Sequence, residues 1–549
     1  MTSPVIQPRS KRSKTIRRIG IIGIGLAILL GYLLYPLASH DYDLPVDEKA
    51  IQEKNTFLTA PIASRPVARQ PNIVVLVADD LGKTDISLYG NKIVRTSAID
   101  SLAAQGVTFT EGYVTAAICS PSRAGLLTGR YQQRFGHELQ PVNRYPKNRM
   151  QQLLAGLFID KQQLEFANNT GIPTPENVAR QGLPLGEITI ADLLRKNGYA
   201  TGIIGKWHLG SNEDFLPLKR GFDYHYGFYE AFAWYTDTTS PGLVNVHHKG
   251  VMDSHIWDLG GQGNSLVRRG NEIIHTKDYL TNQLAEEAVQ FIDQHREKPF
   301  FLYVPFNAPH TPFQAYKKDI EKYEAQGVDR NKAVYYAMIE YLDRAIGKIH
   351  QKIRDAGLED NTLIVFLSDN GGATYTDVTS NAPLKGGKLS LYDGGINVPY
   401  VVKWKGHIPE GITDNRPVSS LDIFATASAV SGSALPSGRK YDGVNLIPFL
   451  AKPDSATPHE TLFWRAGSNK AVRKGEWKLV MNEKDNITAL YNLIKDKEEK
   501  HNLAASYPEK VKDLQKTLNE WEKGLVKPLW PSTGYYRNEF DGVEDRYNL

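Results

Sequence analysis

The chain has 549 residues, of which 41% are hydrophobic and 23% are charged. This composition is typical of a globular protein and excludes an intrinsically disordered chain, a collagen and a coiled coil. The net charge of +4 is too small to indicate nucleic-acid binding, which usually needs a concentrated basic face. The single cysteine, Cys119, excludes an internal disulfide and a zinc site made of thiolates.

The N-terminal segment departs most from the average composition. Six basic residues between Arg9 and Arg18 precede an uncharged stretch from Ile19 to Ser39, which approaches the ~20 residues that span a bilayer. Positive charge before an apolar run is typical of an export signal or a signal anchor. We therefore predict that residues 1–40 direct export to a bacterial periplasm, either as a cleaved signal or as an inner-membrane anchor. Residues 41–70 are polar, contain three prolines, and are predicted to be a linker.

The middle of the chain alternates short apolar runs with helical patterns. The apolar runs predict buried strands at residues 72–78, 200–205, 300–306 and 363–367. Amphipathic spacing predicts helices at residues 188–196, 279–295 and 333–356. This alternation indicates an α/β fold with a large, mostly parallel sheet sandwiched by helices, which we assign to residues 71–453.

A polar cluster follows each of the four predicted strands. The clusters are Asp79-Asp80, Lys206-Trp-His208, Asn307-Ala-Pro-His310 and Ser368-Asp-Asn-Gly371. Ligands bind outside the carboxyl ends of the strands in such sheets. The sequence therefore predicts that the four clusters converge on one site.

The last part of the chain changes character. Short strand patterns at residues 461–464, 471–473 and 477–480 precede an amphipathic helix at residues 508–523. They predict a C-terminal subdomain, residues 454–549, made of a small antiparallel sheet and a closing helix. Residues 530–549 carry no clear pattern.

The segment from Cys119 to Arg130 reads Cys-Ser-Pro-Ser-Arg-Ala-Gly-Leu-Leu-Thr-Gly-Arg. Pro121 suits the first turn of a helix, which would put Ser120 or Cys119 at the cap. Free backbone N–H groups and the helix dipole favour anions at that end, and Arg123 would add positive charge. A lone cysteine is usually a small buried hydrophobe, but the surrounding motif argues against that interpretation here.

This segment resembles the signature of the type I sulfatases, a family of the alkaline phosphatase-like superfamily. Other motifs of the family recur in order over residues 70–520, including Asp79-Asp80, Gly205-Lys-Trp-His-Leu-Gly210, Ala308-Pro-His-Thr-Pro312, Ser368-Asp-Asn-Gly371 and Pro383-Leu-Lys-Gly-Gly-Lys388. The sequence departs from the pattern at Asp393, where glutamate is commoner, and at Lys385, where arginine is commoner. The likeness is strongest to bacterial polysaccharide sulfatases.

The resemblance implies that a formylglycine-generating maturation enzyme oxidises Cys119 to Cα-formylglycine, also called 3-oxoalanine. One hydroxyl of the hydrated aldehyde would attack sulfur and displace the alcohol, and deprotonation of the other would expel sulfate. The resemblance assigns the following residues to catalysis: Cys119, Arg123, Lys206, His208, His310 and Lys388.

The resemblance also distributes these roles among the residues. Arg123 and Lys206 would steady the formylglycine, while Lys206, His310 and Lys388 would contact the substrate. His310 would donate a proton to the leaving oxygen, and His208 would contact the hydrate and assist the release of sulfate. His137 and His225 have weaker contexts and are candidate substrate contacts or structural residues.

Four residues offer only oxygen donors, namely Asp79, Asp80, Asp369 and Asn370. Such donors suit a hard cation such as Ca²⁺ better than zinc. The resemblance assigns these four residues to the metal and adds the formylglycine at Cys119 as a further ligand.

The substrate is the least specified part of the prediction. Residues 222–257 are rich in aromatic side chains, which either form platforms for sugar rings or pack a long insertion. We predict a sulfated polysaccharide, such as carrageenan, ulvan or a glycosaminoglycan. Two alternatives stay open: a phosphate or phosphonate ester hydrolase of the same superfamily, and an inactive glycan-binding homologue.

Overall fold

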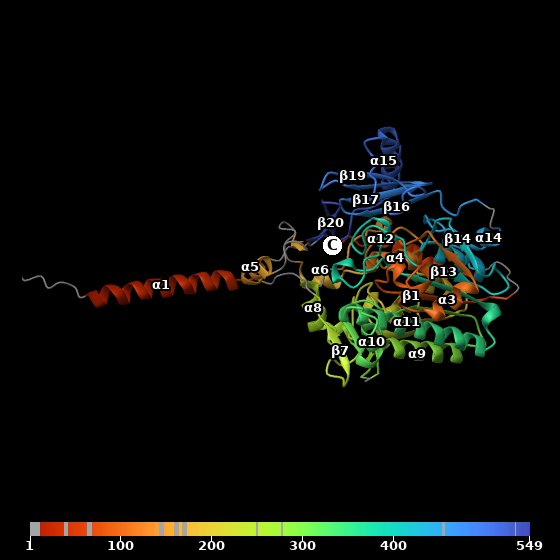
Figure 1. The fold of residues 1–549 in the computed structure, drawn as a ribbon, viewed down its shortest axis with the longest axis horizontal. Coiled ribbons are helices and arrows are strands. Elements are labelled where there is room, and N and C mark those ends of the chain that lie inside the picture. Colours follow the sequence, from red (N-terminus) through yellow and green to blue (C-terminus); the bar gives the residue numbers. More distant parts are fainter. Residues whose placement is uncertain are drawn as a thin grey trace, which may run out of the picture.

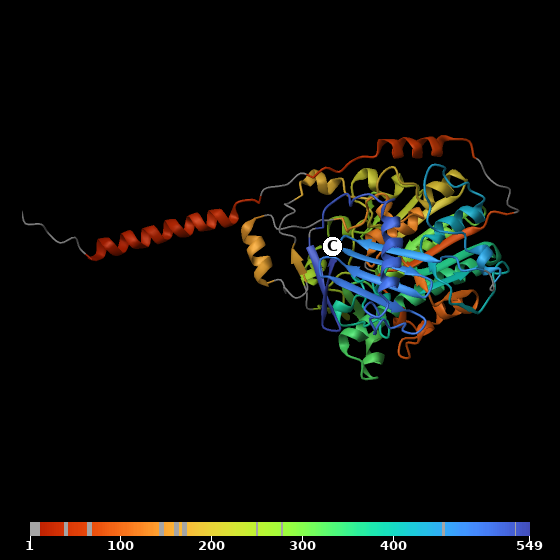
Figure 2. The same cartoon turned by 90° about the horizontal axis from the view of Figure 1, so that it is seen from above.

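Figure 1 shows the fold as a globular body from which one long helix projects. The structure is a computed structural model, and it describes residues 11–37, 42–62, 69–141, 148–158, 164–166, 173–248, 251–275, 278–452, 456–532 and 534–549. The projecting helix is α1 (Lys11–Leu34), and both views show it extending away from the body (Figure 1, Figure 2).

The body is built around a ten-stranded sheet with the order β14-β2-β13-β12-β1-β10-β5-β6-β8-β9. Its centre consists of the four predicted strands, which run parallel to one another: β12 (Thr362–Ser368), β1 (Asn72–Ala78), β10 (Phe300–Pro305) and β5 (Ala200–Lys206). The other strands are β6 (Tyr224–Phe228), β8 (Arg268–Arg269), β9 (Glu272–Ile273), β13 (Tyr400–Lys403), β2 (Val107–Phe109) and β14 (Ile412–Asp414). Strand β6 continues the parallel order, whereas β13 and β8 pair antiparallel with their inner neighbours. The predicted mostly parallel sheet is therefore confirmed.

Helices cover both faces of the sheet because its central strands are apolar on both sides. In β1, Val75 packs into one hydrophobic cluster and Val74 into the other. The cluster of Val74 includes side chains of α3 (Ser97–Ala104), α9 (Leu280–Gln294), α10 (Lys317–Glu324) and α11 (Arg330–Asp355). The cluster of Val75 includes side chains of α4 (Cys119–Thr128), α7 (Ile190–Lys196) and α13 (Asp422–Ser431). The three predicted helices correspond to α7, α9 and α11.

The C-terminal part forms the predicted antiparallel sheet and closing helix. Its strands are β16 (Thr461–Ala466), β17 (Asn469–Lys474), β18 (Trp477–Asn482) and β19 (Ile487–Asn492). Helix α15 (Pro508–Glu522) packs on this sheet through Leu514, Leu518 and Trp521. The predicted boundary between residues 453 and 454 falls outside the described residues.

Short elements complete the described chain. They are β3 (Gly112–Tyr113), α5 (Arg149–Phe158), β4 (Leu164–Phe166), α6 (Pro175–Ala179), β7 (Leu243–Val246), α8 (Val251–Leu259), β11 (Phe313–Tyr316), α12 (Asp393–Ile396), β15 (Val418–Ser419), α14 (Ile447–Leu450), β20 (Gly534–Phe540) and β21 (Val543–Asn548). Strands β20 and β21 form a hairpin that pairs with the distant β4. The tail without a clear sequence pattern is therefore ordered by pairing with another part of the chain.

The predicted linker is not a simple spacer, which corrects the sequence interpretation. Within it, α2 (Glu48–Thr59) is capped by Asp47, whose side chain accepts a hydrogen bond from the N–H of Ala50. Lys54 of this helix is buried, and its Nζ lies 2.7 Å from Asp192 Oδ2 on α7. Lys54 and the partly buried Phe57, which packs against the hydrophobic core, both anchor this helix to the body.

Helix α1 fits the predicted export or anchor segment. Among the described residues, its 20-residue stretch Thr15–Leu34 is the one helix long and apolar enough to cross a membrane, and none of it is buried. These properties are compatible with either a signal sequence or an anchor.

A buried ion network joins the C-terminal sheet to the α/β body. Lys478 on β18 places its Nζ 2.6 Å from Asp393 Oδ1 and 2.8 Å from Glu499 Oε1. The other Glu499 oxygen accepts a hydrogen bond of 2.7 Å from the backbone N–H of Asp393. Asp393 begins α12, which directly follows the loop that carries Lys388.

We expect Lys478→Met to destabilise the protein by about 3–5 kcal/mol, because it leaves two buried carboxylates without their cation. Thermal unfolding measures the effect. The matched control is Lys512→Met, which breaks an exposed pair with Glu509 and should change stability by less than about 1 kcal/mol. Equal unfolding midpoints for the two variants would contradict the structural role assigned to the network.

Candidate active site

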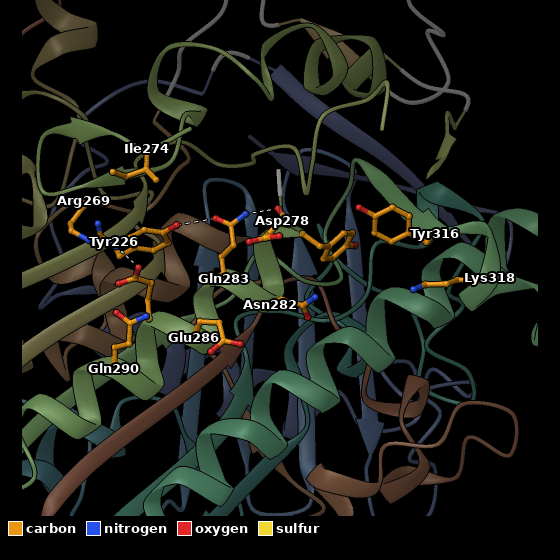
Figure 3. Close-up of a pocket in the computed structure, with 12 residues that line it drawn as sticks. Tyr226, Arg269, Ile274, Asp278, Asn282, Gln283, Glu286, Gln290, Tyr316 and Lys318 are labelled. Atoms are coloured by element: carbon orange, nitrogen blue, oxygen red, sulfur yellow. Dashed lines mark hydrogen bonds and ion pairs between the residues drawn. The ribbon is translucent and has the colours of Figure 1, made fainter. Parts of the chain in front are cut away.

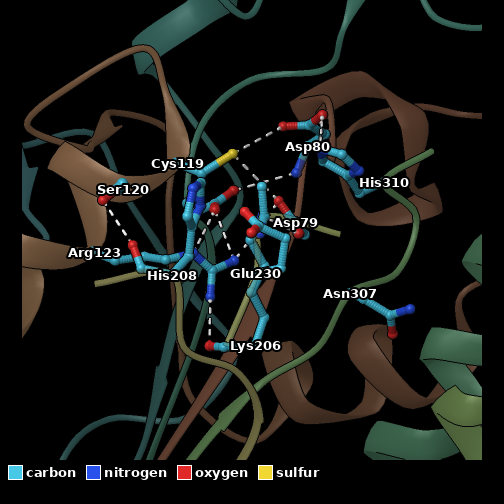
Figure 4. Close-up of polar contacts among 12 residues, drawn as sticks. Asp79, Asp80, Cys119, Ser120, Arg123, Lys206, His208, Glu230, Asn307 and His310 are labelled. Carbon is cyan, nitrogen blue, oxygen red and sulfur yellow. Dashed lines mark hydrogen bonds and ion pairs between the residues drawn. The ribbon is translucent and has the colours of Figure 1, made fainter. Parts of the chain in front are cut away.

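The polar clusters that follow the central strands meet at one edge of the sheet. Asp79 and Asp80 follow β1, Asp369 and Asn370 follow β12, and Lys206 is the last residue of β5. Cys119 opens α4 at the same place, next to Asp79, Asp80 and Arg123 (Figure 4). All ten residues singled out from the sequence are buried: Asp79, Asp80, Cys119, Arg123, Lys206, His208, His310, Asp369, Asn370 and Lys388.

Cys119 is the first residue of α4 rather than its cap, which is a small correction to the prediction. The cap is Ile118, whose side chain makes no capping bond. The Cys119 Sγ lies 3.6 Å from Asp79 Oδ1 and 3.8 Å from Asp80 Oδ1. Burial raises the pKa of the Cys119 thiol well above its usual range, against the opposing effect of Lys206 and Lys388. The unmodified thiol is therefore a poor nucleophile, because only the thiolate attacks efficiently.

The acidic side of the cluster offers atoms suited to a metal ion. Ligand atoms of Asp79, Asp80, Cys119 and His310 all lie within 4.8 Å of one another. Asp80 has a left-handed backbone with φ of 60°, and its N–H donates to Asp369 Oδ1 over 3.2 Å. This bond fixes the unusual backbone that presents the Asp80 carboxylate to the cluster.

Asn370 supplies a specific test of the fit to a cation. Its Nδ2 donates to Asp80 Oδ1 over 2.7 Å, but its buried Oδ1 has no hydrogen-bond partner among the described residues. A buried oxygen without a partner is costly, and a bound cation would satisfy it. Carboxylate and amide oxygens are the donors that Ca²⁺ prefers, so these residues fit a hard cation.

Three buried cations balance the three buried carboxylates of the cluster. Arg123 Nη2 lies 2.7 Å from Asp369 Oδ2, and Lys206 Nζ lies 2.6 Å from Asp79 Oδ2. Lys388 Nζ lies 2.8 Å from Asp80 Oδ2. Because these six charges cancel, a divalent metal would leave the site positive and therefore favourable to an anion.

The electrostatics of Asp79 and Asp80 differ although the residues are adjacent. Burial raises the pKa of Asp79 to about 7, with Lys206 opposing the shift. Burial acts on Asp80 too, but the ammonium of Lys388 overcomes it and holds the pKa of Asp80 well below its usual range. Asp80 is therefore the firmly ionised member of the pair.

The two histidines of the cluster are neutral in this arrangement, because burial lowers the pKa of both His208 and His310 well below the usual value. His310 Nδ1 lies 2.5 Å from the carbonyl oxygen of Thr311 and must be the protonated nitrogen. Its Nε2 then faces Lys388 Nζ at 3.3 Å as an acceptor. The exchangeable proton of this pair thus resides on Lys388.

Most of the aromatic side chains between residues 222 and 257 pack the fold and are not sugar platforms, which favours the packing alternative. Tyr226, Tyr229, Phe232 and Tyr235 are all buried. The Tyr235 hydroxyl lies 2.6 Å from the carbonyl oxygen of Asn307 and 2.8 Å from that of His310. Tyr235 therefore supports the loop that carries His310.

The two histidines with weaker sequence contexts are buried and bonded within the protein. His137 Nε2 lies 2.7 Å from Ser120 Oγ. His225 Nδ1 lies 3.3 Å from the carbonyl oxygen of Gly270, and its ring stacks on Tyr229. These contacts favour structural roles for both residues.

The structure adds residues that the sequence interpretation missed. Figure 4 draws Glu230 within the cluster, and Glu230 lies two residues after β6. Its position shortly after a parallel strand is the sequence signal that could have identified Glu230. Tyr375 interacts with Lys388, which lowers the Tyr375 pKa while burial raises it to about 12. Tyr375 lies in no motif and follows no strand directly.

A separate pocket of about 750 Å³ lies along α9 and contains none of the ten residues (Figure 3). Its walls include Tyr226, Arg269, Gln283 and Tyr316. Tyr226 donates to Gln283 Oε1 there, so its polar side chains are in part bonded to each other.

Comparison with known proteins decides the family. Residues 71–433 match the model of the sulfatase family. The chain belongs to the sulfatase family. The arylsulfatase of Hemicentrotus pulcherrimus is 34% identical over 424 residues, which cover 74% of this chain and 67% of that protein. Human steryl-sulfatase is 32% identical over 461 residues, covering 73% of each chain.

A solved structure extends the likeness to the fold. The crystal structure of Ps i-CgsB in complex with k-i-k-neocarrahexaose is 31% identical to this sulfatase, with a TM-score of 0.69. The match covers 84% of this chain and 95% of that one. This sulfatase is therefore a sulfuric ester hydrolase on the fold of its family.

Proposed function

We propose that this sulfatase removes sulfate from a sulfated polysaccharide, or from its oligosaccharide fragments, through formylglycine at Cys119. The observation that carries the proposal is the position of Cys119. It opens α4 among three buried cations and beside carboxylate and amide oxygens that fit a metal. The alternative of an inactive homologue finds no support in this site, because every residue of the motif-derived set is present in the cluster.

Conversion of Cys119 by a formylglycine-generating maturation enzyme is part of the proposal. The buried thiol is a poor nucleophile as it stands. The hydrate of formylglycine supplies two hydroxyls on one carbon, one for attack on sulfur and one for the release of sulfate. Serine or cysteine has no second hydroxyl and cannot release sulfate in this way.

The residues around Cys119 would bind the sulfate group and handle protons. Lys206 and Lys388 supply fixed positive charge for sulfate oxygens on opposite sides of the Asp79-Asp80 pair. The Lys388–His310 pair would deliver the proton to the leaving oxygen, since His310 Nε2 faces the Lys388 ammonium. His208 has a buried Nδ1 without a partner, and it would contact the nucleophile.

Ca²⁺ is the metal that we propose for the oxygen donors of Asp79, Asp80, Asp369 and Asn370. When bound, it would supply positive charge that stabilises the sulfate oxygens and orients the nucleophile. Arg123 holds Asp369 by a hydrogen bond of 2.9 Å from Nε to Oδ2 and by an ion pair in which Nη2 lies 2.7 Å from the same oxygen. It would keep that carboxylate fixed whether or not the metal is present.

The organisation of the chain completes the proposal. Residues 71–453 would be the catalytic domain and residues 454–549 a subdomain that supports it through Lys478. Residues 1–40 would export the enzyme to the periplasm or anchor it at the inner membrane. Sulfated glycans from outside the cell are met there.

The glycan substrate is proposed from the likeness to Ps i-CgsB, which was solved in complex with k-i-k-neocarrahexaose. We expect a sulfated galactan oligosaccharide to be hydrolysed with kcat/KM at least about 10-fold above that of an aryl sulfate. Binding of sugar units remote from the sulfate can stabilise the transition state. Sulfate release from a panel of defined oligosaccharides, measured beside an aryl sulfate, tests this. Rapid aryl sulfate turnover with no activity on any glycan would contradict it.

A further inference from the structure

Ser120 joins the two functional segments of the proposed site. It follows Cys119 in α4 and is fully buried. Its Oγ lies 2.7 Å from the carbonyl oxygen of His208, a residue 88 positions away, and 2.7 Å from His137 Nε2. Figure 4 shows the bond between Ser120 and the main chain of His208.

The direction of these hydrogen bonds follows from the atoms involved. A carbonyl oxygen only accepts, so the single proton of the Ser120 hydroxyl must point to His208. The Nε2 of His137 must then donate to Ser120 Oγ. Burial lowers the pKa of His137 to about 4, so the ring is neutral and carries its one proton on Nε2. In this tautomer Nδ1 carries no proton, so its 3.2 Å contact with the Gly182 carbonyl oxygen is not a hydrogen bond.

His208 needs such support because its backbone is unusual. Its φ is 57°, in the left-handed region that non-glycine residues rarely adopt. Its N–H donates to the carbonyl oxygen of Tyr229 over 3.2 Å, and its own carbonyl accepts from Ser120. Strained residues persist where the surroundings over-determine them. The Ser120 hydroxyl therefore fixes one of the two peptide groups that flank His208.

The ring of His137 is itself held in place by a residue of the C-terminal segment. Trp530, which is 1% exposed, packs its ring nearly perpendicular to that of His137 with centroids 5.0 Å apart. The Trp530 indole donates to the carbonyl oxygen of Gln140 over 2.8 Å. A chain of contacts thus runs from the C-terminal segment through His137 and Ser120 to His208.

We propose that Ser120, held by His137, is a positioning residue that fixes the imidazole of His208 relative to the reactive side chain at position 119. This inference rests on the proposed function, in which His208 contacts the nucleophile. The link is short because Ser120 is covalently adjacent to position 119 and hydrogen-bonded to the peptide of His208.

The test begins with Ser120→Ala and the rescue variant Ser120→Thr. For each variant, the thermal unfolding midpoint and the aldehyde content at position 119 are measured first. Sulfate release is then assayed. Loss of positioning should lower kcat about 10–100-fold. KM should change less than about 2-fold, because binding of the substrate before the reaction is unaffected. Ser120→Thr keeps the hydroxyl and should restore most of the activity. A folded and matured Ser120→Ala enzyme with the parent kcat would overturn the proposal.

A double-mutant cycle separates positioning from general destabilisation. If Ser120 acts through His208, adding Ser120→Ala to His208→Ala should lower kcat no further, whereas independent effects would multiply. Multiplying effects would overturn the proposal. The matched control is Thr201→Val, which removes another buried hydroxyl that donates to a main-chain carbonyl, that of Gly221. It should lower the unfolding midpoint and leave kcat unchanged.

Two further measurements keep the inference distinct from the proposed function. If Ser120→Ala fails to fold or mature, His137→Ala replaces it in the same cycle with the same expected non-additivity. The crystal structure of the Ser120→Ala protein needs no turnover, and we expect His208 to leave its left-handed backbone there. An unchanged His208 would overturn the positioning claim. Absence of sulfate release by the parent protein would instead overturn the proposed function.

Discussion

Cys119→Ala is expected to reduce sulfate release by at least about 10⁴-fold, because removing a nucleophile leaves only the contribution of the surrounding groups. Cys119 is the first residue of α4, and its Sγ lies beside Asp79 and Asp80 in the cluster. Steady-state release of inorganic sulfate measures the effect.

The fold of this variant should survive. Cys119 is 1% exposed and hydrogen-bonds only weakly through its thiol, so its loss removes one small buried group. A thermal unfolding midpoint close to that of the parent is the control. Cys119→Ser extends the test, because one hydroxyl can accept a sulfate group but cannot expel it. Normal turnover by Cys119→Ala, or by a Cys119→Ser protein shown to carry no aldehyde at position 119, would contradict the formylglycine hypothesis.

Removal of the metal is expected to have the second-largest effect, a loss of activity of about 10³-fold or more. Charge stabilisation by a metal is worth several kcal/mol. Each 1.4 kcal/mol changes the rate about tenfold. A strong chelator should inactivate the enzyme, calcium should restore it, and zinc should not. Elemental analysis of the active protein should find calcium. Two zinc ions and no calcium would favour the phosphatase alternative.

Asn370→Leu tests the metal site through the side-chain amide of one residue. It preserves the shape of the side chain but removes both the buried Oδ1, which has no partner among the described residues, and the Nδ2 that donates to Asp80 Oδ1. We expect calcium affinity, measured by calorimetry, to fall while the fold stays intact. Asn197→Leu is the matched control, because Asn197 is a buried amide that bonds to the carbonyl of Ser431. Equal calcium binding by the two variants would contradict the assignment.

The fold was predictable where the signal lay within a short stretch of chain. Strands β1 and β10 are continuous apolar runs because they are buried on both faces, and α11 carries a regular apolar stripe. Strands β20 and β21 have no such stripe, and their pairing with β4 joins residues 164–166 to residues 534–536. Long-range pairing of this kind leaves no local pattern in the sequence.

The residues of the site were likewise predictable only where their signal lay within a short stretch of chain. Asp79, Lys206 and Asp369 were predictable because each stands at the carboxyl end of a buried strand and within a motif. The bond between Ser120 and His208 was not, because it joins main chain to side chain across 88 positions. The left-handed backbone of His208 also has no sequence signal, since histidine gives no indication of such a conformation.

Mass spectrometry of the peptide that contains position 119, taken from protein that releases sulfate, tests the central claim most directly. The account predicts an aldehyde residue without sulfur at position 119, captured by a hydrazine probe, in the fraction of molecules that are active. A protein that hydrolyses sulfate esters while Cys119 remains a thiol throughout would contradict it.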